Sequence, residues 1–499
     1  MQLLEIFSNS LKILIFSPEI ADMAAQRKFE EIKKLLQKYH QSHLLAFWNQ
    51  LDTTQRQNLL TQIQQLDWPK IDTWVANLVK KPPSAQMTAN FIPASSYSPT
   101  PADPHQKRKF ATAIELGNHL ISAGKVAILT VAGGLGTRLG FDGPKGDYPI
   151  SPIKNKTFFQ IFAETIATAS KKYNTLCPWY IMTSPAIDAA TKKIFLANDY
   201  YGLDAENVFI FQQGTLPTFS FDGKILLEDK ANIAFSPDGH GGCIKALHKS
   251  DALEDMKKRG IEFISYFQVD NPLVNLFDPL FIGLHTLDQA EMSSKALVKT
   301  EPTENVGNFC VVDGRLAVIE YAEFNKLSKE LVEKRNPDGS LAFLGSIGIH
   351  IINRTFVEKL NAKGFSLPLH SAIKEISHID QHGNPVKPDQ PNGIKLESFV
   401  FDALPSASKS VILQTARSQE FAPTKNATGI DSVETTRQMM IARAADWLQS
   451  AGVTIPQKQD GSPDCLLEIA PGFALEKDDL KAKLNQIPKI NRGDKIYLA

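Results

Sequence analysis

The sequence predicts an α/β protein with a doubly wound, mostly parallel sheet at its centre, a helical region before it and a small α+β domain after it. From about Lys125, short apolar runs alternate with amphipathic helical segments, which is the pattern of βαβ units. Residues 24 to about 80 instead carry apolar side chains every three or four positions, which is typical of helices. Ligands of a doubly wound sheet bind beyond the carboxyl ends of its strands, so the residues at these ends are the first candidates for a functional site.

The N-terminal region is expected to be helical and to end in an extended connection. Residues 29–48 and 56–79 have helical spacing of apolar positions. The stretch from Lys80 to Gln106 is rich in Pro, Ser, Ala and Thr, so we expect it to be extended. We therefore predict a helical region with its linker at 1–105, the sheet domain at 106–402 and a C-terminal domain at 403–499.

The sheet domain is expected to contain four clear strands and two clear helices in its first half. The strands are β-branched or aromatic apolar runs, and the helices have amphipathic spacing. The predicted strands are 126–131, 179–184, 208–213 and 261–270, and the predicted helices are 158–173 and 241–260.

The C-terminal domain is expected to combine one helix with short strands. Residues 409–416 (KSVILQTA) read as a strand, residues 432–452 as a helix, and the chain ends in DKIYLA, which we assign to a late strand pair.

Composition excludes several classes of partner. The chain has 499 residues, which is too long for one ordinary core. Its 54 Lys and Arg balance its 54 Asp and Glu, so the basic excess of a nucleic-acid-binding protein is missing. No apolar run approaches the roughly 20 residues that a membrane helix needs. We therefore expect neither nucleic acid nor a membrane as a partner.

The four cysteines favour a cytoplasmic location. Cys177, Cys243, Cys310 and Cys465 are scattered without paired spacing, so they predict neither a disulfide framework nor a thiolate zinc site. The N-terminus has an apolar patch but no basic leader and no clear cleavage site, which fits a signal peptide poorly.

A glycine-rich loop follows the first predicted strand, in LTVAGGLGTRLGFDGPKG (129–146). It is not a P-loop, because its lysine is flanked by proline and glycine, and it misses the G-x-G-x-x-G pattern because Leu139 stands in place of the last glycine. The amides from Gly133 to Thr137 can form a concave anion site, and Arg138 and Lys145 add two cations at fixed offsets. This combination predicts a polyphosphate ligand.

The loop AGGLGTRLG…PKG resembles the signature loop of the UTP-dependent sugar-1-phosphate uridylyltransferases. The chain as a whole is similar to the eukaryotic-type UDP-N-acetylglucosamine pyrophosphorylases, from about Phe29 to Arg437. The resemblance continues in FQQGTLPTFSFDGKILLEDK, SPDGHGGCIKAL, QVDNPLVNLFDPLFIG, EPTENVGNFCVVDGRLAVIEYAEF, PNGIKLESFVFD and APTKNATG. It implies a Rossmann-like nucleotidyltransferase fold. Because the likeness starts only near Met23, we expect Met23 to be the natural start.

The resemblance also implies the reaction. An oxygen of a sugar-1-phosphate attacks the α-phosphorus of UTP, pyrophosphate leaves and a UDP-sugar forms. The nucleophile is already anionic, so catalysis requires cations, Mg²⁺ and preorganised amides rather than a general base.

Five residues are expected to serve catalysis. By the resemblance, Arg138 contacts the β- and γ-phosphates, Lys145 the α-phosphate, Lys395 the nucleotide phosphates and Lys425 the sugar phosphate. Asp270 ends the strand 261–270, where a carboxylate can hold Mg²⁺ between phosphates.

The uracil pocket is expected around Gln213. A side-chain amide that donates and accepts in one plane complements the uracil edge, and Gln213 matches the family residue with that role. Gln212 should point the other way if this segment is extended. The remaining nucleotide contacts expected from the glycine loop and its surroundings are Gly133, Gly134, Gly136, Thr137 and Gly239.

The sugar site departs from the family pattern at two positions. Gly307, Glu320 and Tyr321 are retained, whereas His240 and Ser346 stand where asparagine is expected. Histidine at the first position is typical of UDP-glucose pyrophosphorylases. A buried polar mismatch changes binding by roughly 1–3 kcal/mol, which is enough to change the preferred sugar.

Three functions therefore stay open. N-acetylglucosamine-1-phosphate is the first expected substrate, and a UDP-glucose, UDP-galactose or broad UDP-sugar pyrophosphorylase is the alternative. A nucleotide-sugar-binding protein without catalysis is the third, but it predicts damage among the five catalytic positions, and none is damaged.

Overall fold

The computed structural model describes residues 18–80, 91–362, 364 and 367–499, and it forms two compact units. The first unit comprises Met1–Ser84, Thr215–Gly239 and Leu369–Glu397, and the second comprises Ala85–Gly214, His240–Pro368 and Ser398–Ala499. These units differ from the three consecutive ranges predicted from the sequence. Two stretches of the predicted sheet domain belong with the N-terminal helices, and the predicted C-terminal domain belongs with the sheet.

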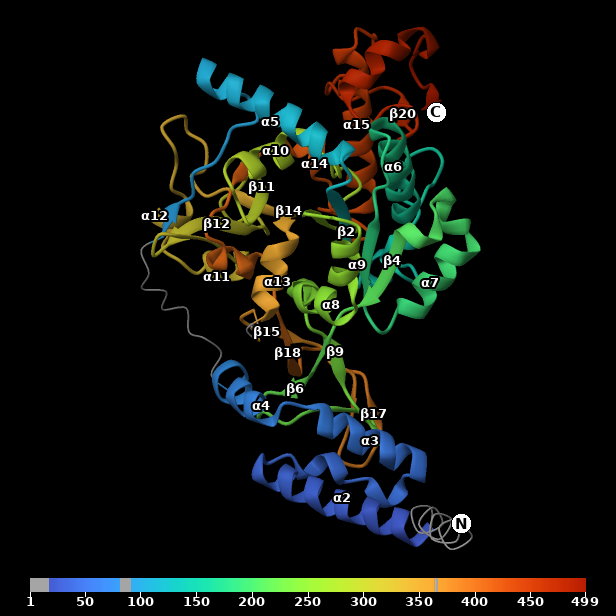
Figure 1. Cartoon of the computed structure of the whole chain (residues 1–499), viewed down its shortest axis with the longest axis vertical. Coiled ribbons are helices and arrows are strands. Elements are labelled where there is room, and N and C mark those ends of the chain that lie inside the picture. The colour runs from blue at the N-terminus through green and yellow to red at the C-terminus, as the bar shows by residue number, and fades with distance from the viewer. Residues whose placement is uncertain (1–17, 81–90, 363, 365–366) are drawn as a thin grey trace, which may run out of the picture. The chain divides into compact units, whose positions relative to one another are not determined.

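The first unit begins with the helices α2 (Pro18–Lys38), α3 (Thr53–Gln65) and α4 (Trp68–Trp74), which confirms the helices predicted between 24 and 80 (Figure 1). The start of α3 is fixed by a capping box. The Asp52 carboxylate accepts a hydrogen bond from the Gln55 N–H at 2.9 Å, and the Gln55 side chain accepts one from the Asp52 N–H at 3.0 Å.

Short strands complete the first unit, and its core includes Leu36, Ile63, Phe219 and Leu396. One sheet has three strands, in the order β15 (His370–Lys374), β18 (Gly393–Glu397) and β6 (Phe219–Ser220). The remaining pairs are β5 (Thr215–Pro217) with β9 (Phe235–Pro237), β7 (Leu227–Asp229) with β8 (Asn232–Ile233), and β16 (His378–Ile379) with β17 (Pro385–Val386).

The second unit is built on a ten-stranded sheet, one half of which is parallel. In this half β10, β2, β3 and β4 are parallel neighbours, with Gln268 opposite Val131 and Thr183 opposite Gln212 at their carboxyl ends. The four carboxyl ends therefore share one edge of the sheet. All four strands confirm the sequence prediction: β2 (Val126–Val131), β3 (Trp179–Thr183), β4 (Val208–Gln212) and β10 (Phe263–Gln268).

The other half of this sheet is organised around the long strand β14 (Gly345–Asn353). β14 is antiparallel to β10, β11 and β12, and β11 pairs in parallel with β19. The sequence predicted a strand only at 409–416, where β19 (Ile412–Gln414) lies. The further strands are β1 (Ile92–Pro93), β11 (Met292–Leu297), β12 (Gly307–Val312) and β13 (Arg315–Ile319).

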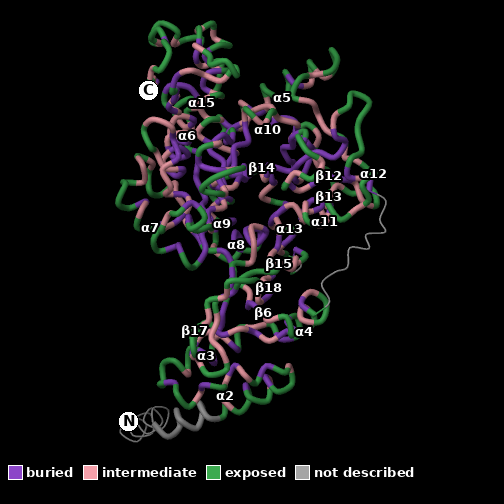
Figure 2. The backbone as a smooth tube through the Cα atoms, turned by 180° about the vertical axis from the view of Figure 1, so that it is seen from behind, coloured by how far each residue is buried: buried purple, intermediate pink, exposed green. Residues whose placement is uncertain are grey.

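The sheet is covered on both faces, which confirms the doubly wound prediction. Alternate residues of β2 enter two different cores: Val126 and Ile128 belong to one, and Ala127 and Leu129 to the other. The first core is covered by α5 (Pro104–Ser122), α6 (Phe158–Tyr173) and α10 (Pro279–Leu287), and the second by α8 (Cys243–Lys249), α9 (Ala252–Lys258) and α13 (Arg354–Ala362). Figure 2 shows that the strands of this sheet are mostly buried and that the helices around them combine buried and exposed residues. The helix α7 (Asp188–Ala197) follows β3.

Two predicted elements need correction. The single helix predicted at 241–260 is two helices, because Asp251 takes a left-handed backbone with φ of 61° between α8 and α9. The extended connection predicted up to Gln106 ends earlier, because Asp103 caps α5 by accepting a hydrogen bond from the Gln106 N–H at 2.8 Å. Residues 81–90 of that connection lie outside the described residues.

The last hundred residues add a small core of their own to the second unit. It contains Leu448, Leu467 and Leu480 and is built from α15 (Val433–Ser450) and the pair β20 (Leu466–Ile469) and β21 (Lys495–Leu498). The predicted helix and the late strand pair are confirmed, and the pair is parallel. α14 (Arg417–Glu420) and the short helices α11 (Tyr321–Phe324) and α12 (Lys329–Val332) complete the unit.

Two features bear on the expected partners and location. Within the described part of the chain, no helix has both the length and the apolar character that crossing a bilayer requires. All four cysteines are buried and free.

Two glycines let α5 and α10 touch backbone to backbone. A Cβ atom at Gly117 would lie 1.9 Å from the Pro279 carbonyl oxygen, and one at Gly283 would lie 1.8 Å from the Ala113 carbonyl oxygen. Any larger side chain at either position forces the two helices apart.

We expect Gly117→Ala to lower the free energy of unfolding by roughly 1–3 kcal/mol, because overpacking outweighs the better helix propensity of alanine. The matched control is Gly472→Ala, whose Cβ meets nothing within 4 Å and which should stay within about 0.5 kcal/mol of the wild type. Urea titration followed by circular dichroism measures both. Equal stability of the two variants would contradict the backbone contact.

Candidate active site

The glycine-rich loop after β2 folds back on itself. The Gly136 N–H donates to the Gly143 carbonyl at 2.8 Å, and the Lys145 N–H donates to the Gly134 carbonyl at 3.0 Å. Gly140 makes the return possible with a left-handed φ of 69°. These bonds fix the offset between the exposed Arg138, on the short turn Thr137–Leu139, and the half-buried Lys145.

Lys145, Asp270 and the segment that carries Lys425 meet beyond the end of β10. The Lys145 ammonium lies 3.5 Å from the Asp270 carboxylate and 3.4 Å from the Thr424 carbonyl oxygen. The Thr424 N–H donates to the Asp270 carbonyl at 2.9 Å, so Lys425 follows directly on this contact. Three of the five predicted catalytic residues are thereby brought together.

A buried asparagine next to Asp270 makes this meeting possible. The Asn271 amide donates to the Glu420 carbonyl at 2.7 Å and accepts from the Ala422 N–H at 3.0 Å. It therefore joins the end of β10 to the segment that leads to Lys425. Asn271 was not predicted as a site residue, and its only signal in the sequence was its place in the block QVDN.

Lys425 is held by its own loop. Its N–H donates to the Asp431 carbonyl at 2.7 Å, and its ammonium lies 3.6 Å from the Asp431 carboxylate. Asp431 adopts a left-handed φ of 54°, which closes the loop.

Gln213 and Gly133 lie against each other, as two residues of one base pocket must. A Cβ atom at Gly133 would lie 2.3 Å from the Gln213 side-chain oxygen. Gln213 is buried and Gln212 is exposed, so the two side chains differ in direction as expected from an extended backbone. Thr183, at the end of β3, accepts the Gln213 N–H at 2.9 Å and positions it.

Among the predicted sugar residues, Gly307 and Ser346 are direct neighbours on β12 and β14. Glu320 lies just after β13 and caps α11, because its carboxylate accepts the Ala322 N–H at 3.1 Å. Tyr321 is the first residue of that helix. The strand pairing of β12 with β13 and β14 thus gathers these four positions at one end of the antiparallel half.

His240 is enclosed by aromatic side chains that the sequence analysis missed. Its ring stacks on Phe399 at 5.2 Å and meets Phe401 at 5.8 Å between centroids. Its Nδ1 accepts the Val400 N–H at 3.2 Å and lies 3.3 Å from the Tyr266 hydroxyl. The spacing of the two phenylalanines in ESFVFD was the only signal for them.

A second histidine, His350 on β14, lies next to Tyr266. Its ring is 5.4 Å from that of Tyr266, and its Nδ1 is 2.8 Å from the Ser294 hydroxyl. Burial, followed by the electrostatic interaction with nearby His240, lowers the pKa of His350 to about 3. His350 is therefore neutral at physiological pH.

Two predicted residues belong to the first unit. Lys395 lies in the middle of β18, opposite Ala372 on β15, and Gly239, with a left-handed φ of 84°, ends the segment 215–239. Gly239 directly precedes His240 in the sequence.

The described residues contain no cluster of three or more His, Cys, Asp or Glu side chains arranged for a metal ion. Asp270 is thus a single carboxylate at the end of β10. One carboxylate is nevertheless a common protein contribution to a Mg²⁺ ion that also binds phosphates.

Comparisons with known proteins identify the family. The family model described as UTP–glucose-1-phosphate uridylyltransferase matches residues 56–499. The human protein named UDP-N-acetylhexosamine pyrophosphorylase-like protein 1 is 35% identical over 485 residues, which cover 91% of this chain and 94% of that protein. UDP-N-acetylglucosamine pyrophosphorylase of Saccharomyces cerevisiae is 33% identical over 473 residues, covering 90% of this chain and 96% of the yeast protein.

A solved structure agrees with this result. The crystal structure of uridine diphosphate N-acetylglucosamine pyrophosphorylase from Trypanosoma brucei in complex with an inhibitor has a TM-score of 0.77 and 25% sequence identity, and the match covers 96% of this chain and 98% of that one. The chain therefore belongs to the UTP–glucose-1-phosphate uridylyltransferase family of UDP-sugar pyrophosphorylases and is a nucleotidyltransferase.

Proposed function

We propose that this enzyme transfers the uridylyl group of UTP to N-acetylglucosamine-1-phosphate, forming UDP-N-acetylglucosamine and pyrophosphate. The names of its relatives support the reaction and the sugar. The observation that carries the proposal is the approach of Lys145, Asp270 and the Lys425 segment to one another beyond β10.

The chemistry follows from the charges of the reactants. A phosphate oxygen of the sugar-1-phosphate attacks the α-phosphorus of UTP, a new P–O bond forms, and the bond to the β-phosphate oxygen breaks. Since the nucleophile is already anionic, no proton has to be removed. The barrier comes from bringing two polyanions together and from charge that develops on the phosphates, which preorganised cations and amides reduce.

Each predicted cation has a place in this scheme. Arg138 binds the β- and γ-phosphates of UTP, Lys145 stabilises the α-phosphate under attack, and Lys395 also binds the nucleotide phosphates. Lys425 orients the attacking sugar phosphate. The side chain of Lys145 is only 15% exposed, so its charge acts in a less screened environment than that of a surface lysine.

Asp270 is the residue that would hold Mg²⁺. Its carboxylate is a hard oxygen ligand, it is 14% exposed, and the phosphates of the substrates would supply further oxygen ligands. When bound, the ion supplies charge neutralisation on the phosphates.

Gln213 would recognise uracil together with the backbone of Gly133, Gly134 and Gly239, while the amides of Gly136 and Thr137 face the phosphates. The substrates and products that bind are thus UTP, a sugar-1-phosphate, a UDP-sugar and pyrophosphate.

The four free, buried cysteines support our expectation of a reducing, cytoplasmic compartment.

The sugar pocket favours N-acetylglucosamine through its retained residues Gly307, Glu320 and Tyr321. His240 and Ser346 support the second candidate, a pyrophosphorylase for glucose, galactose or several sugars. The environment of His240 favours a fixed ring, because the Val400 N–H points at its Nδ1. An acceptor at Nδ1 places the proton of a neutral imidazole on Nε2.

The first test is a uridylyltransferase assay with UTP and Mg²⁺ that compares the 1-phosphates of N-acetylglucosamine, N-acetylgalactosamine, glucose and galactose by kcat/KM. We expect N-acetylglucosamine-1-phosphate to be preferred. Preference for glucose or galactose would replace it by the second candidate. Binding of uridine nucleotides without turnover of any sugar phosphate would show a binding protein instead.

We expect Asp270→Asn to lower kcat by at least about 100-fold, because an amide cannot neutralise or hold a divalent cation as a carboxylate does. Removal of Mg²⁺ with EDTA should have the same effect on the wild type. The control is Asp338→Asn. Asp338 is an exposed carboxylate outside the candidate site, so this variant should leave kcat unchanged. A kcat that is insensitive to both EDTA and Asp270→Asn would contradict a metal role for this residue.

Gly133→Ala should raise the KM for UTP by roughly tenfold, because its Cβ displaces the Gln213 amide from a buried site. Gly134→Ala is the matched variant, since its Cβ meets nothing of the protein within 4 Å. Any rise in KM at Gly134 therefore reports close approach of the nucleotide itself. Thermal unfolding should be the same for both variants within a few degrees, and an unchanged KM in Gly133→Ala would exclude Gln213 from base recognition.

The double variant His240→Asn with Ser346→Asn restores the family residues of the sugar pocket. We expect it to increase the ratio of kcat/KM for N-acetylglucosamine-1-phosphate over glucose-1-phosphate by about tenfold or more, since each buried polar mismatch is worth roughly 1–3 kcal/mol. An unchanged ratio would mean that neither position contacts the sugar.

A further inference from the structure

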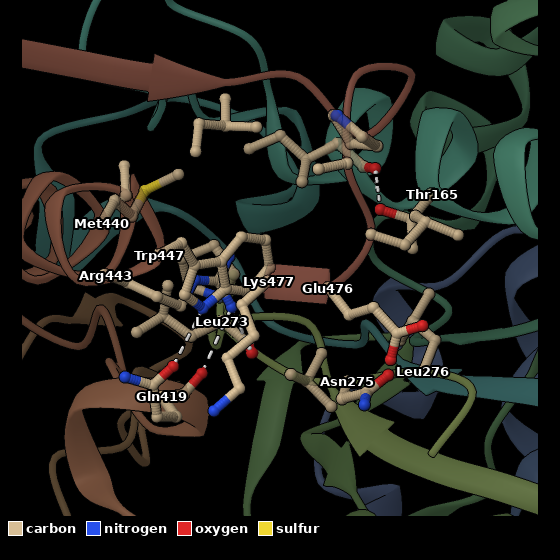
Figure 3. Close-up of a pocket in the computed structure, with 18 of the residues that line it drawn as sticks. Thr165, Leu273, Asn275, Leu276, Gln419, Met440, Arg443, Trp447, Glu476 and Lys477 are labelled. Atoms are coloured by element: carbon tan, nitrogen blue, oxygen red, sulfur yellow. Dashed lines mark hydrogen bonds between the residues drawn. The ribbon is translucent and has the colours of Figure 1, made fainter. Parts of the chain in front are cut away.

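A cavity of about 470 Å³ lies on the C-terminal side of the second unit. It is bounded by α6, by the segment 272–277, by α15 and by the segment 467–478 (Figure 3). Its volume falls within the range of small-molecule sites. None of the residues assigned above to nucleotide, sugar or metal lines it.

The acidic side chains that line the cavity all have partners. Each carboxylate accepts at least one hydrogen bond or forms an ion pair, so none is left to attract a cation. The pairs are Glu420 with Lys295, Glu468 with the N–H groups of Ile153 and Lys154, Glu476 with Lys172, Asp478 with Lys481, and Asp446 with the side-chain amide of Gln419.

Unlike these acids, two cationic side chains that line the cavity form no ion pair within the described part of the chain. Among the described residues, neither Arg443 nor Lys477 has a carboxylate within 4 Å. Within the part of the chain that the structure describes, the Arg443 guanidinium donates only through Nη1, to the carbonyl oxygens of Leu273 at 2.8 Å and Gln419 at 3.2 Å. Its Nε and Nη2 groups are left for a ligand.

Arg443 keeps its charge despite its surroundings. Burial lowers the pKa of Arg443 to about 10, so the guanidinium is protonated at neutral pH. It lies 5.1 Å from the centre of the Trp447 ring, and that ring is held in place because its N–H donates to Gln419 at 3.0 Å. A fixed cation beside a fixed aromatic face is a preorganised arrangement for an anion with an apolar group.

The rest of the wall combines apolar side chains, among them Ile161, Phe162, Leu273 and Met440, with polar ones such as Thr165 and Asn275. We propose that this cavity binds a small amphipathic anion, a carboxylate or phosphate monoester that carries an aromatic or aliphatic group. The anionic group bonds to the free N–H groups of Arg443 and approaches Lys477, and the apolar group packs on Trp447 and Met440.

The position of Arg443 links this cavity to the active site. Leu273 follows closely on Asp270 and Asn271, and Gln419 precedes the segment that leads to Lys425. Arg443 thus ties together, from the cavity side, the two segments that Asn271 joins from within. A ligand that engages Arg443 should change how Asp270 and Lys425 are held, and this effect on turnover rests on the proposed function, whereas binding does not.

The test is calorimetric titration of the full chain, without nucleotide, with phenylacetate and phenyl phosphate as the carboxylate and phosphate probes. Phenylacetamide is the neutral analogue of the first probe. We expect at least one anion to bind saturably with 1:1 stoichiometry and to bind at least roughly tenfold more tightly than phenylacetamide, because a charge-assisted hydrogen bond is lost in the amide. Equal affinity for the amide, or no saturable binding of either anion, would overturn the proposal.

Variants locate the bound anion. Arg443→Met should weaken binding by roughly tenfold or more, and Lys477→Ala, on the exposed rim and harmless to the fold, by roughly two- to fivefold. Lys495→Ala removes an exposed lysine of the same region that does not line the cavity and should have no effect. Lys425→Ala should also have no effect. Loss of binding in Lys425→Ala, with none in Lys477→Ala, would place the anion in the sugar-phosphate site and overturn the proposal.

The effect on turnover is measured separately. Addition of the bound probe should change kcat of uridylyl transfer at least twofold in the wild type and less in Lys477→Ala. An unchanged kcat at saturating probe would overturn the link to the active site. Absence of turnover with every sugar phosphate would overturn the proposed function, while the titration would still decide whether the cavity binds anions.

Discussion

The side-chain amide of Asn271 is the interaction on which the geometry of the candidate site depends. It is buried, and it bonds with both its donor and its acceptor to the backbone of one neighbouring segment, at Glu420 and Ala422. Between the end of β10 and this segment, which forms no strand there, the amide thereby supplies the hydrogen bonds that strand pairing would otherwise make. Because Asp270 is its neighbour in the chain, and Lys425 follows Ala422 closely, one planar group sets the spacing between the carboxylate proposed to hold the metal and the lysine proposed to bind phosphate.

The segment that Asn271 holds is anchored from behind by a buried ion cluster. Lys295 on β11 is only 2% exposed and contacts the carboxylates of Asp278, at 2.5 Å, and Glu420. Burial lowers the pKa of Lys295, but the two carboxylates outweigh it and raise the pKa, so the lysine stays charged. Removing one member of a buried pair costs about 3–5 kcal/mol because its partner is left uncompensated. Glu420 therefore serves twice, with its carboxylate in the cluster and with its carbonyl oxygen on Asn271.

The sequence predicted those features that depend on local pattern. Apolar runs and helical spacing predicted the strands β2, β3, β4 and β10 and the helix α6. The position of Asp270 at the end of a strand followed from the same pattern. The opposite directions of Gln212 and Gln213 follow from the two-residue repeat of an extended chain.

Features that depend on contacts between distant segments were beyond such patterns. β14 contains two glycines and a histidine and acquires its strand structure by pairing with β10, β11 and β12. The composition of the two units also needs contacts between segments far apart in the chain. The role of Asn271 and the packing of Phe399 on His240 arise in the same way, because an amide or a phenyl ring has no sequence period that reveals its partner.

The pairing of Lys425 with Asp431 on its own loop has a consequence for the phosphate binding that we propose for this lysine. In the free protein this lysine already has a counter-ion, so an arriving phosphate exchanges one ionic partner for another instead of neutralising a bare charge. The displaced Asp431 carboxylate becomes hydrated again, and its loop, closed by a left-handed residue, can relax. When a phosphate replaces Asp431 as the partner of Lys425, fewer salt ions are released than when it binds an unpaired lysine. Phosphate affinity should therefore be lower, and it should depend less on ionic strength.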